Sequence, residues 1–210
     1  MRRTLLALPL AATFAVPASA HPHVFVDATA GFAFDEAGRL SGLRITWTYD
    51  AFTSLILFDT LSLDADGDGQ LDDADRAAIV DGETDWPPEY DGDVHLDIGG
   101  TAVAMGRPRD GRAWMEADRI SVSFDLPLAE PLDAPEGTRL RLYDPLYYYA
   151  YTVVGVEAAE GPCAPRLDPF VADEATAAVQ AELAALTREQ MPDEPGIGAR
   201  FADEVTLSCG

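Results

Sequence analysis

The sequence predicts an α+β protein: a β-rich, antiparallel, layered domain with an inserted EF-hand-like helix-loop-helix and a helix near its carboxyl end. Apolar residues recur with period 2 in short stretches that are separated by turn residues, a pattern typical of strands. One apolar segment of helical length directly precedes a loop rich in Asp and Gly. The chain shows no repeated β-α alternation, so a parallel α/β fold is not expected.

The first 20 residues have the features of a secretory signal peptide. A basic start is followed by an apolar run over residues 4–16 and by Ala-Ser-Ala at residues 18–20, which is a typical cleavage signal. We expect residues 21–210 to form a single domain of about 190 residues, long enough to bury a sizeable core. The periplasm is the expected location, with secretion as the alternative.

The mature chain is strongly acidic. The formal net charge of the full chain, which includes two arginines of the signal, is -23 at pH 7, and every basic residue apart from the three histidines is arginine. Such a charge repels nucleic acids and anionic lipids. Beyond the signal, no apolar run approaches the ~20 residues that span a bilayer. We therefore expect no nucleic-acid partner and no membrane insertion of the mature chain.

The period-2 and helical patterns predict the following elements in order. The strands are expected at residues 24–34, 40–49, 94–98, 101–105, 119–126, 138–143 and 201–209, and the helices at residues 51–61, 73–80 and 173–189. Asp50 is the expected N-cap of the first helix, whose aromatic and aliphatic residues we place in the core. Five of the seven tyrosines lie within residues 143–151. We expect them to make core contacts rather than to line a carbohydrate or ligand groove.

Cleavage after residue 20 would place two histidines at the new amino terminus. His21 and His23 would then contribute two imidazoles beside a free amine. Imidazole suits zinc, copper, nickel and iron, and residues i and i+2 of an extended chain face the same way. Pro22 has no amide hydrogen to lose, which disfavours the copper and nickel mode that uses deprotonated amides.

A further ligand for this terminal site would come from Asp27 or from His95, the third histidine of the chain. His95 lies between apolar strand residues, so we expect it to face away from them and to be structural or solvated. The alternative for the whole segment is a polar terminus that binds no metal.

Residues 64–75 match the EF-hand calcium loop. Carboxylates stand at loop positions 1, 3, 5, 9 and 12, glycine at position 6 and leucine at position 8. The expected ligands are Asp64, Asp66, Asp68, the backbone carbonyl of Gln70, Asp72 and Asp75. Asp75 replaces the usual glutamate, and its shorter side chain favours weaker calcium binding or magnesium. The alternative is a solvated acidic turn.

The two cysteines, Cys163 and Cys209, are expected to form a disulfide in an oxidising compartment. Such a bond stabilises by roughly 4 kcal/mol on the chain-entropy model. Neither cysteine has the close-spaced partner of a zinc motif, so a metal-thiolate pair is the less favoured interpretation.

Several of these features together resemble one protein family. They are His-Pro-His-Val-Phe-Val-Asp at residues 21–27, Trp47, Tyr-Asp at residues 49–50, the acidic loop at residues 64–75, Tyr-Asp-Pro at residues 143–145 and the late segment 201–209. In this order they resemble the bacterial periplasmic proteins called domain of unknown function 1007. The resemblance implies a periplasmic component of a transport system that is associated with nickel and cobalt type permeases. It supplies no ligand set, so the metal ligands above come from spacing alone.

Three functions are compatible with the sequence. The favoured one is a non-enzymatic accessory protein that binds a transition metal (zinc, nickel, cobalt or copper) at its amino terminus, holds calcium in the acidic loop and works with an inner-membrane metal permease. The second is a calcium-stabilised interaction module without transition-metal chemistry. The third is a copper enzyme with a histidine brace, in which His95 would be the distant histidine. No phosphate-binding loop or hydrolase motif is present in the sequence.

Overall fold

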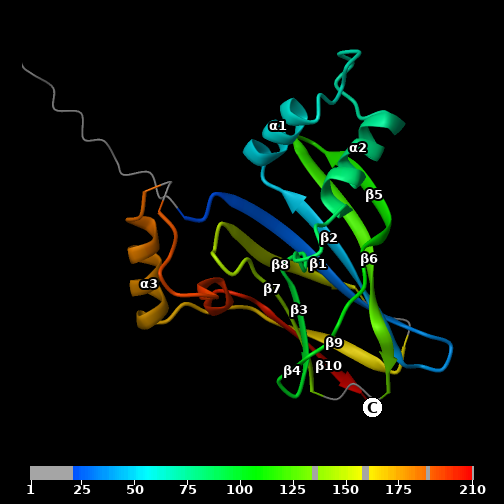
Figure 1. Ribbon diagram of the computed structural model, residues 1–210, viewed down its shortest axis with the longest axis vertical. Helices are drawn as coiled ribbons and strands as arrows, with labels where there is room; N and C mark the ends of the chain where they lie inside the picture. The colour runs from blue at the N-terminus through cyan, green and yellow to red at the C-terminus, as the bar shows by residue number, and fades with distance from the viewer. Residues whose placement is uncertain (1–20, 134–136, 158–160, 188–189, 210) are drawn as a thin grey trace, which may run out of the picture.

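The computed structural model describes residues 21–133, 137–157, 161–187 and 190–209, so the predicted signal peptide lies outside the described residues. Two five-stranded sheets form the body of the protein (Figure 1). The first sheet contains, in spatial order, β5 (Arg109–Glu116), β6 (Arg119–Leu132), β2 (Leu40–Tyr49), β1 (Val24–Phe34) and β8 (Tyr149–Glu157). The second contains β4 (Thr101–Ala102), β3 (Val94–Ile98), β7 (Thr138–Leu142), β10 (Glu204–Cys209) and β9 (Cys163–Asp168). The predicted β-rich, layered α+β class is confirmed at this level.

One hydrophobic core lies between the two sheets. Ile45 and Phe124 of the first sheet belong to the same buried cluster as Leu96, Leu140 and Val205 of the second. These side chains are at most 2% exposed, and burial of each contributes about 1.5–3 kcal/mol. The alternate apolar residues of β1 and β2 therefore face the core, as the sequence predicts.

The strands differ from the sequence-based expectation in the direction of one pairing and in their number. β1 pairs with β8 in parallel, whereas the other pairs are antiparallel. Strands β5, β8 and β9 were not predicted. β5 and β9 lie at sheet edges, where charged residues and proline are tolerated because one row of backbone groups needs no partner. Their sequences, Arg-Asp-Gly-Arg-Ala-Trp-Met-Glu and Cys-Ala-Pro-Arg-Leu-Asp, therefore lack an apolar strand pattern.

The helix-loop-helix stands at one end of the first sheet (Figure 1). α1 (Ala51–Thr60) begins at Asp50, whose carboxylate accepts hydrogen bonds from the amides of Phe52 and Thr53, so the predicted N-cap is confirmed. α2 (Asp73–Thr84) packs on β5 and β6. Gly111 of β5 permits this packing, because a side chain there would collide with Val80 of α2.

The sequence predicts that the aromatic and aliphatic residues of the first helix lie in the core. This prediction is wrong for half of them. Phe52, Leu55 and Ile56 are 66%, 65% and 48% exposed. The side of α1 that meets the sheet instead buries Ser54, whose hydroxyl accepts a hydrogen bond of 2.9 Å from the amide of Ile120. Apolar residues occur all round this helix, and only one side of it is covered.

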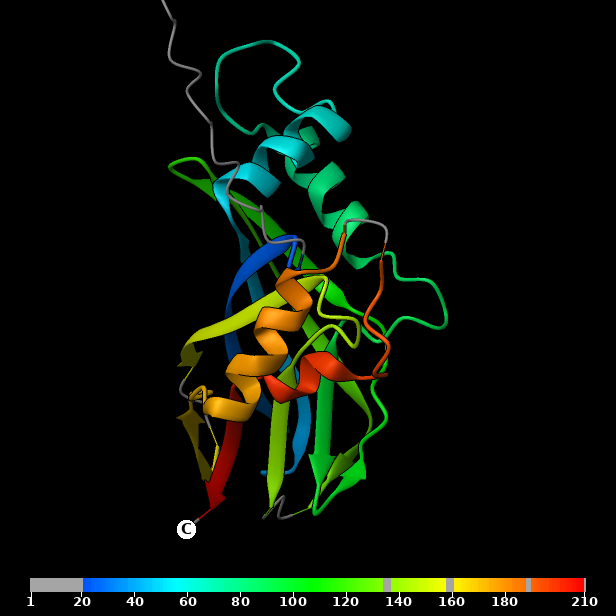
Figure 2. The same cartoon turned by 90° about the vertical axis from the view of Figure 1, so that its left-hand side faces the viewer.

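The carboxyl-terminal helix is shorter than predicted. α3 (Glu174–Ala184) and the 3-10 turn η1 (Ile197–Arg200) lie close together on one side of the molecule (Figure 2). Leu183, Ile197 and Phe201 form a second small core there, against which Tyr147 packs. Most residues of α3 are exposed, and residues 188–189 of the predicted helix lie outside the described residues.

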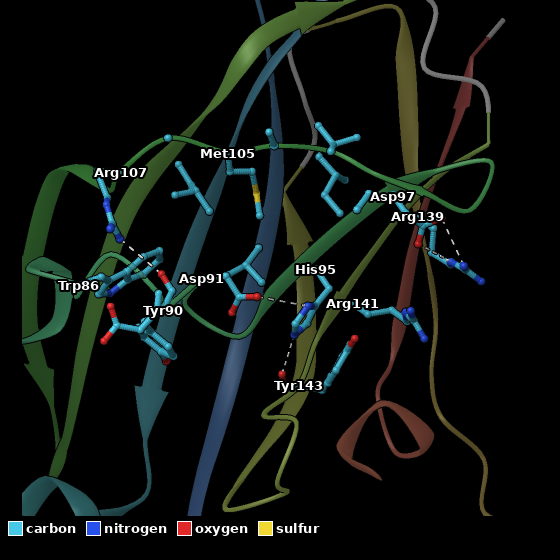
Figure 3. A pocket seen from close by; sticks show the side chains of 18 of the residues that line it. Trp86, Tyr90, Asp91, His95, Asp97, Met105, Arg107, Arg139, Arg141 and Tyr143 are labelled. Carbon is cyan, nitrogen blue, oxygen red and sulfur yellow. Dashed lines mark hydrogen bonds and ion pairs between the residues drawn. The ribbon is translucent and has the colours of Figure 1, made fainter. Parts of the chain in front are cut away.

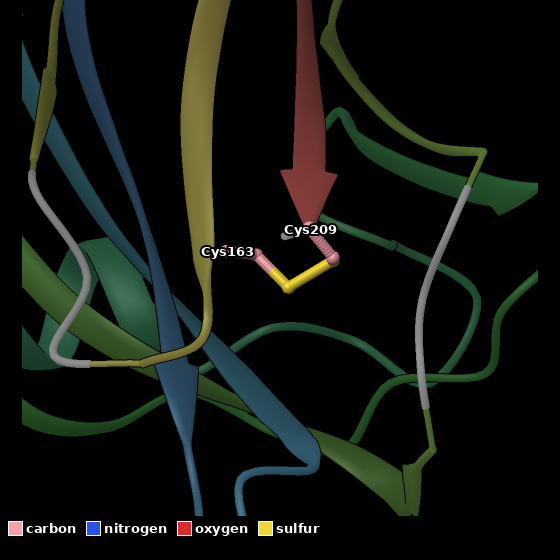
Figure 4. Close-up of a disulfide and its surroundings, with 2 residues drawn as sticks. All are labelled: Cys163 and Cys209. Carbon is pink, nitrogen blue, oxygen red and sulfur yellow. A yellow bond between two sulfur atoms is a disulfide. The ribbon is translucent and has the colours of Figure 1, made fainter.

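The predicted disulfide is present. Cys163 and Cys209 face each other across the antiparallel pair of β9 and β10, and their bond closes a chain separation of 46 residues (Figure 4). It ties the last strand to the edge of the second sheet.

Removal of this disulfide should be strongly destabilising. The Cys163→Ser/Cys209→Ser variant is expected to lose roughly 4 kcal/mol of unfolding free energy, because the unfolded chain regains the entropy of the opened loop. Urea unfolding measures this loss, and reduced wild-type protein provides the comparison without substitution. A difference below about 1 kcal/mol would contradict the expectation.

Candidate metal centres and neighbouring cavities

The acidic loop brings three carboxylates together. Ligand oxygens of Asp64, Asp66 and Asp68 lie within 4.8 Å of one another, the one such group of three or more found among the described residues. Gly67 and Gly69 have φ angles of 75° and 78°, which glycine adopts at no steric cost. Several carboxylate oxygens around one point suit a hard divalent cation such as calcium or magnesium.

The remaining predicted ligands of the loop do not meet the three aspartates at one point. They make hydrogen bonds that hold the two ends of the loop together. The two carboxylate oxygens of Asp75 accept hydrogen bonds from the amides of Asp64 and Asp72, at 3.2 Å and 3.0 Å. Asp72 caps α2, and Gln70 is exposed. Leu71 is buried, as its loop position predicts. The arrangement fits a cation bound by the first half of the loop. The second half of the loop caps the start of α2.

The two amino-terminal histidines lie side by side. The ring centroids of His21 and His23 are 4.9 Å apart, and His21 is only 3% exposed. The His23 ring packs against Tyr148 at 4.5 Å, and its amide donates to the Tyr148 carbonyl at 2.8 Å. Asp144 in turn accepts from the Tyr148 amide at 2.7 Å. The loop between β7 and β8 thus fixes the start of the described chain.

The structure does not place the other two candidate ligands with these histidines. Asp27 accepts a hydrogen bond of 2.7 Å from Arg119. His95 lies on the second sheet, where its ring stacks on Tyr143 with 3.7 Å between centroids.

His95 borders a cavity of about 590 Å³ that lies beside β3 and β7 (Figure 3). Its Nε2 is 2.9 Å from the Tyr143 carbonyl oxygen, and its Nδ1 is 3.7 Å from Asp91. Burial lowers the pKa of His95 below its usual value. The sequence predicts a solvated or structural histidine here, and the half-buried, stacked ring fits the structural role.

The tyrosine-rich segment divides between core and surface. Tyr151 is buried, Tyr149 is half-buried and Tyr148 is 40% exposed. Two acidic residues that the sequence did not single out, Glu83 and Asp93, are held by tyrosine hydroxyls close to this segment. No local signal marks either acid, because both belong to chain segments rich in exposed carboxylates.

Fold and sites together define a two-sheet α+β protein with a candidate cation loop beside its first sheet. The sequence model of the family described as "Protein of unknown function (DUF1007)" matches residues 6–209, and the chain belongs to this family. A Haemophilus influenzae protein described as uncharacterized is 26% identical over 197 residues, which cover 90% of this chain and 91% of that protein. Among the described residues, no helix has both the length and the apolar character needed to cross a membrane.

Proposed function

We propose that this chain is a periplasmic accessory protein of a nickel, cobalt or zinc type transport system, with a structural calcium ion in its acidic loop. The observation that carries the proposal is the pair of imidazoles at residues 21 and 23, whose ring centroids are 4.9 Å apart. Signal cleavage after residue 20 would add the amine of His21 to this pair. Three nitrogen ligands would leave coordination positions of the metal open, which suits a metal that is transferred to another protein.

The calcium part of the proposal rests on the three converging aspartates. A cation there would offset the repulsion between Asp64, Asp66 and Asp68 and would fix the loop that joins α1 to α2. The alternative of a calcium-stabilised interaction module uses this same observation and dispenses with the terminal site. The copper-brace alternative gains no support from the position of His95, which stacks on Tyr143.

An exposed apolar surface supports a membrane permease as the partner. It consists of Phe25, Phe52, Leu55 and Ile56, which are 48–66% exposed, and we call it the α1 surface. Phe25 joins it to the histidines, since it lies two residues after His23 and its amide donates to Asp50 at the start of α1. Clusters of exposed apolar residues mark interaction sites. Docking through the α1 surface would bring the terminal metal next to the permease.

The proposal is tested by the metal content of cells. A strain that lacks the gene should show altered cellular nickel, cobalt or zinc by mass spectrometry, and the wild-type gene should restore it. His23→Ala and the Leu55→Ser/Ile56→Ser variant should both fail to restore it, the first through loss of a ligand and the second through loss of docking.

His95→Ala is the matched histidine control and should restore the metal content, because His95 lines a cavity that neither His21 nor His23 lines. Each variant must reach the wild-type amount in the periplasm. Full restoration by His23→Ala would overturn the transport proposal and leave the calcium-stabilised module.

A further inference from the structure

A second cavity, of about 380 Å³, opens between α2, the end of β2 and the start of β8. Its described lining comprises two tryptophans, four tyrosines, four acidic residues, one glycine and one proline, and contains no arginine, lysine or histidine. Aromatic side chains therefore dominate the lining of the cavity, and all of its charged side chains are acidic. None of the candidate metal ligands lines it.

Two buried carboxyl groups face tyrosine hydroxyls in this cavity. Asp93 accepts hydrogen bonds from Tyr151 at 2.9 Å and from Tyr90 at 3.2 Å, and Glu83 accepts one from Tyr49. Neither acid forms an ion pair with a basic residue in the described part of the chain. Their negative charge is thus left without a protein counterion.

Burial shifts the pKa of both acids upward. Burial raises the pKa of Glu83 and raises that of Asp93 to about 7, assisted by the nearby carboxylates of Asp144 and Asp91 and opposed by the hydroxyls of Tyr151 and Tyr90. A cation in the cavity would oppose the effect of burial and favour the ionised form of both groups.

The aromatic walls suit the same kind of ligand. Trp47 and Trp86 stack with 6.1 Å between centroids, and Tyr149 and Tyr151 stack at 6.2 Å. Tryptophan and tyrosine rings attract organic cations through their negative faces. Trp47 is 3% exposed, and its Nε1–H has no hydrogen-bond acceptor among the described residues.

We infer that this cavity binds a small organic cation, a quaternary ammonium or protonated amine. The four acidic residues of the lining exclude an anion. A metal ion is disfavoured, because three carboxylate oxygens of this cavity do not come within 4.8 Å of one another as those of the acidic loop do. A neutral sugar is the competing ligand class, and its binding is an outcome of the test.

The test uses choline and its neutral isostere, 3,3-dimethylbutan-1-ol, in calorimetric titrations of the whole mature protein at pH 8. The two probes share size and hydroxyl group and differ in charge. Choline is expected to bind about tenfold more tightly, since a desolvated cation–π contact contributes about 1–2 kcal/mol. Equal binding of the two probes, no binding of choline, or binding of glucose in its place would overturn the inference.

Two nearly isosteric variants locate the site. Glu83→Gln and Asp93→Asn keep the acceptor oxygens for the tyrosines but remove the charge, and each should weaken choline binding several-fold. Glu89→Gln is the matched control, because Glu89 is exposed and lies outside this cavity, and it should leave the affinity unchanged. If Asp93→Asn fails to fold, Glu83→Gln and the comparison of choline with its neutral isostere still test whether the cavity binds a cation.

Proton linkage provides an independent readout. Below pH 7 a bound cation must displace a proton from Asp93, so choline affinity should fall as the pH drops from 8 to 6. The fall should be reduced in Asp93→Asn. A pH-independent affinity would remove Asp93 from the site.

Discussion

A single residue added before His21 is expected to weaken transition-metal binding by about a hundredfold. The extension removes the amine from the chelate while both imidazoles remain. Structural zinc sites with four ligands bind with about 10–16 kcal/mol, so each ligand contributes roughly 3 kcal/mol, which corresponds to about a hundredfold in affinity. Titration calorimetry with nickel or zinc on the cleaved and the extended protein measures the difference.

Three variants control this experiment. His23→Ala should weaken binding as the extension does, whereas His95→Ala should leave it unchanged because His95 contacts Tyr143 and Asp91 instead. Pro22→Gly restores the amide hydrogen that proline lacks and should open the amide mode for copper and nickel. Equal affinities of cleaved, extended and His23→Ala proteins would remove the terminal site.

Calcium at a thousandfold excess over its dissociation constant is expected to stabilise the protein by about 4 kcal/mol, because an ion that binds only the folded state shifts the equilibrium by mass action. The melting temperature should therefore rise by several degrees with calcium and fall with a chelator. Asp64→Ala and Asp68→Ala each remove one of the three converging carboxylates and should abolish the response.

Asp81→Ala is the control for lost charge, because Asp81 is an exposed residue of α2 outside the loop. It should retain the calcium response. Identical melting curves of the wild type in calcium and in chelator would identify the segment as a solvated acidic turn.

The elements predicted from sequence are those with local patterns. The β1–β2 hairpin follows from alternating apolar residues, and the start of α1 from Asp50, which both the sequence and the structure place at the cap. The acidic loop follows from residue spacing, and three of its predicted ligands do converge.

The remaining features depend on contacts between distant segments. The parallel pairing of β1 with β8 joins Val26 to Tyr151, and no local pattern encodes it. Asp93 stands in an Asp-Gly-Asp sequence typical of a solvated turn, yet Tyr151, which lies 58 residues further along the chain, buries it. The exposed residues of α1 could not be distinguished from core residues, because composition does not show which side of a helix is covered.

The central claim is that the mature protein carries a transition metal at its amino terminus, and elemental analysis tests it most directly. The protein should be purified from the periplasm of its own cells without added metal. We expect about one nickel, cobalt or zinc ion per chain in the wild type, together with calcium, and loss of the transition metal alone in His23→Ala. Calcium without any transition metal, or copper accompanied by peroxide-dependent turnover, would contradict the account.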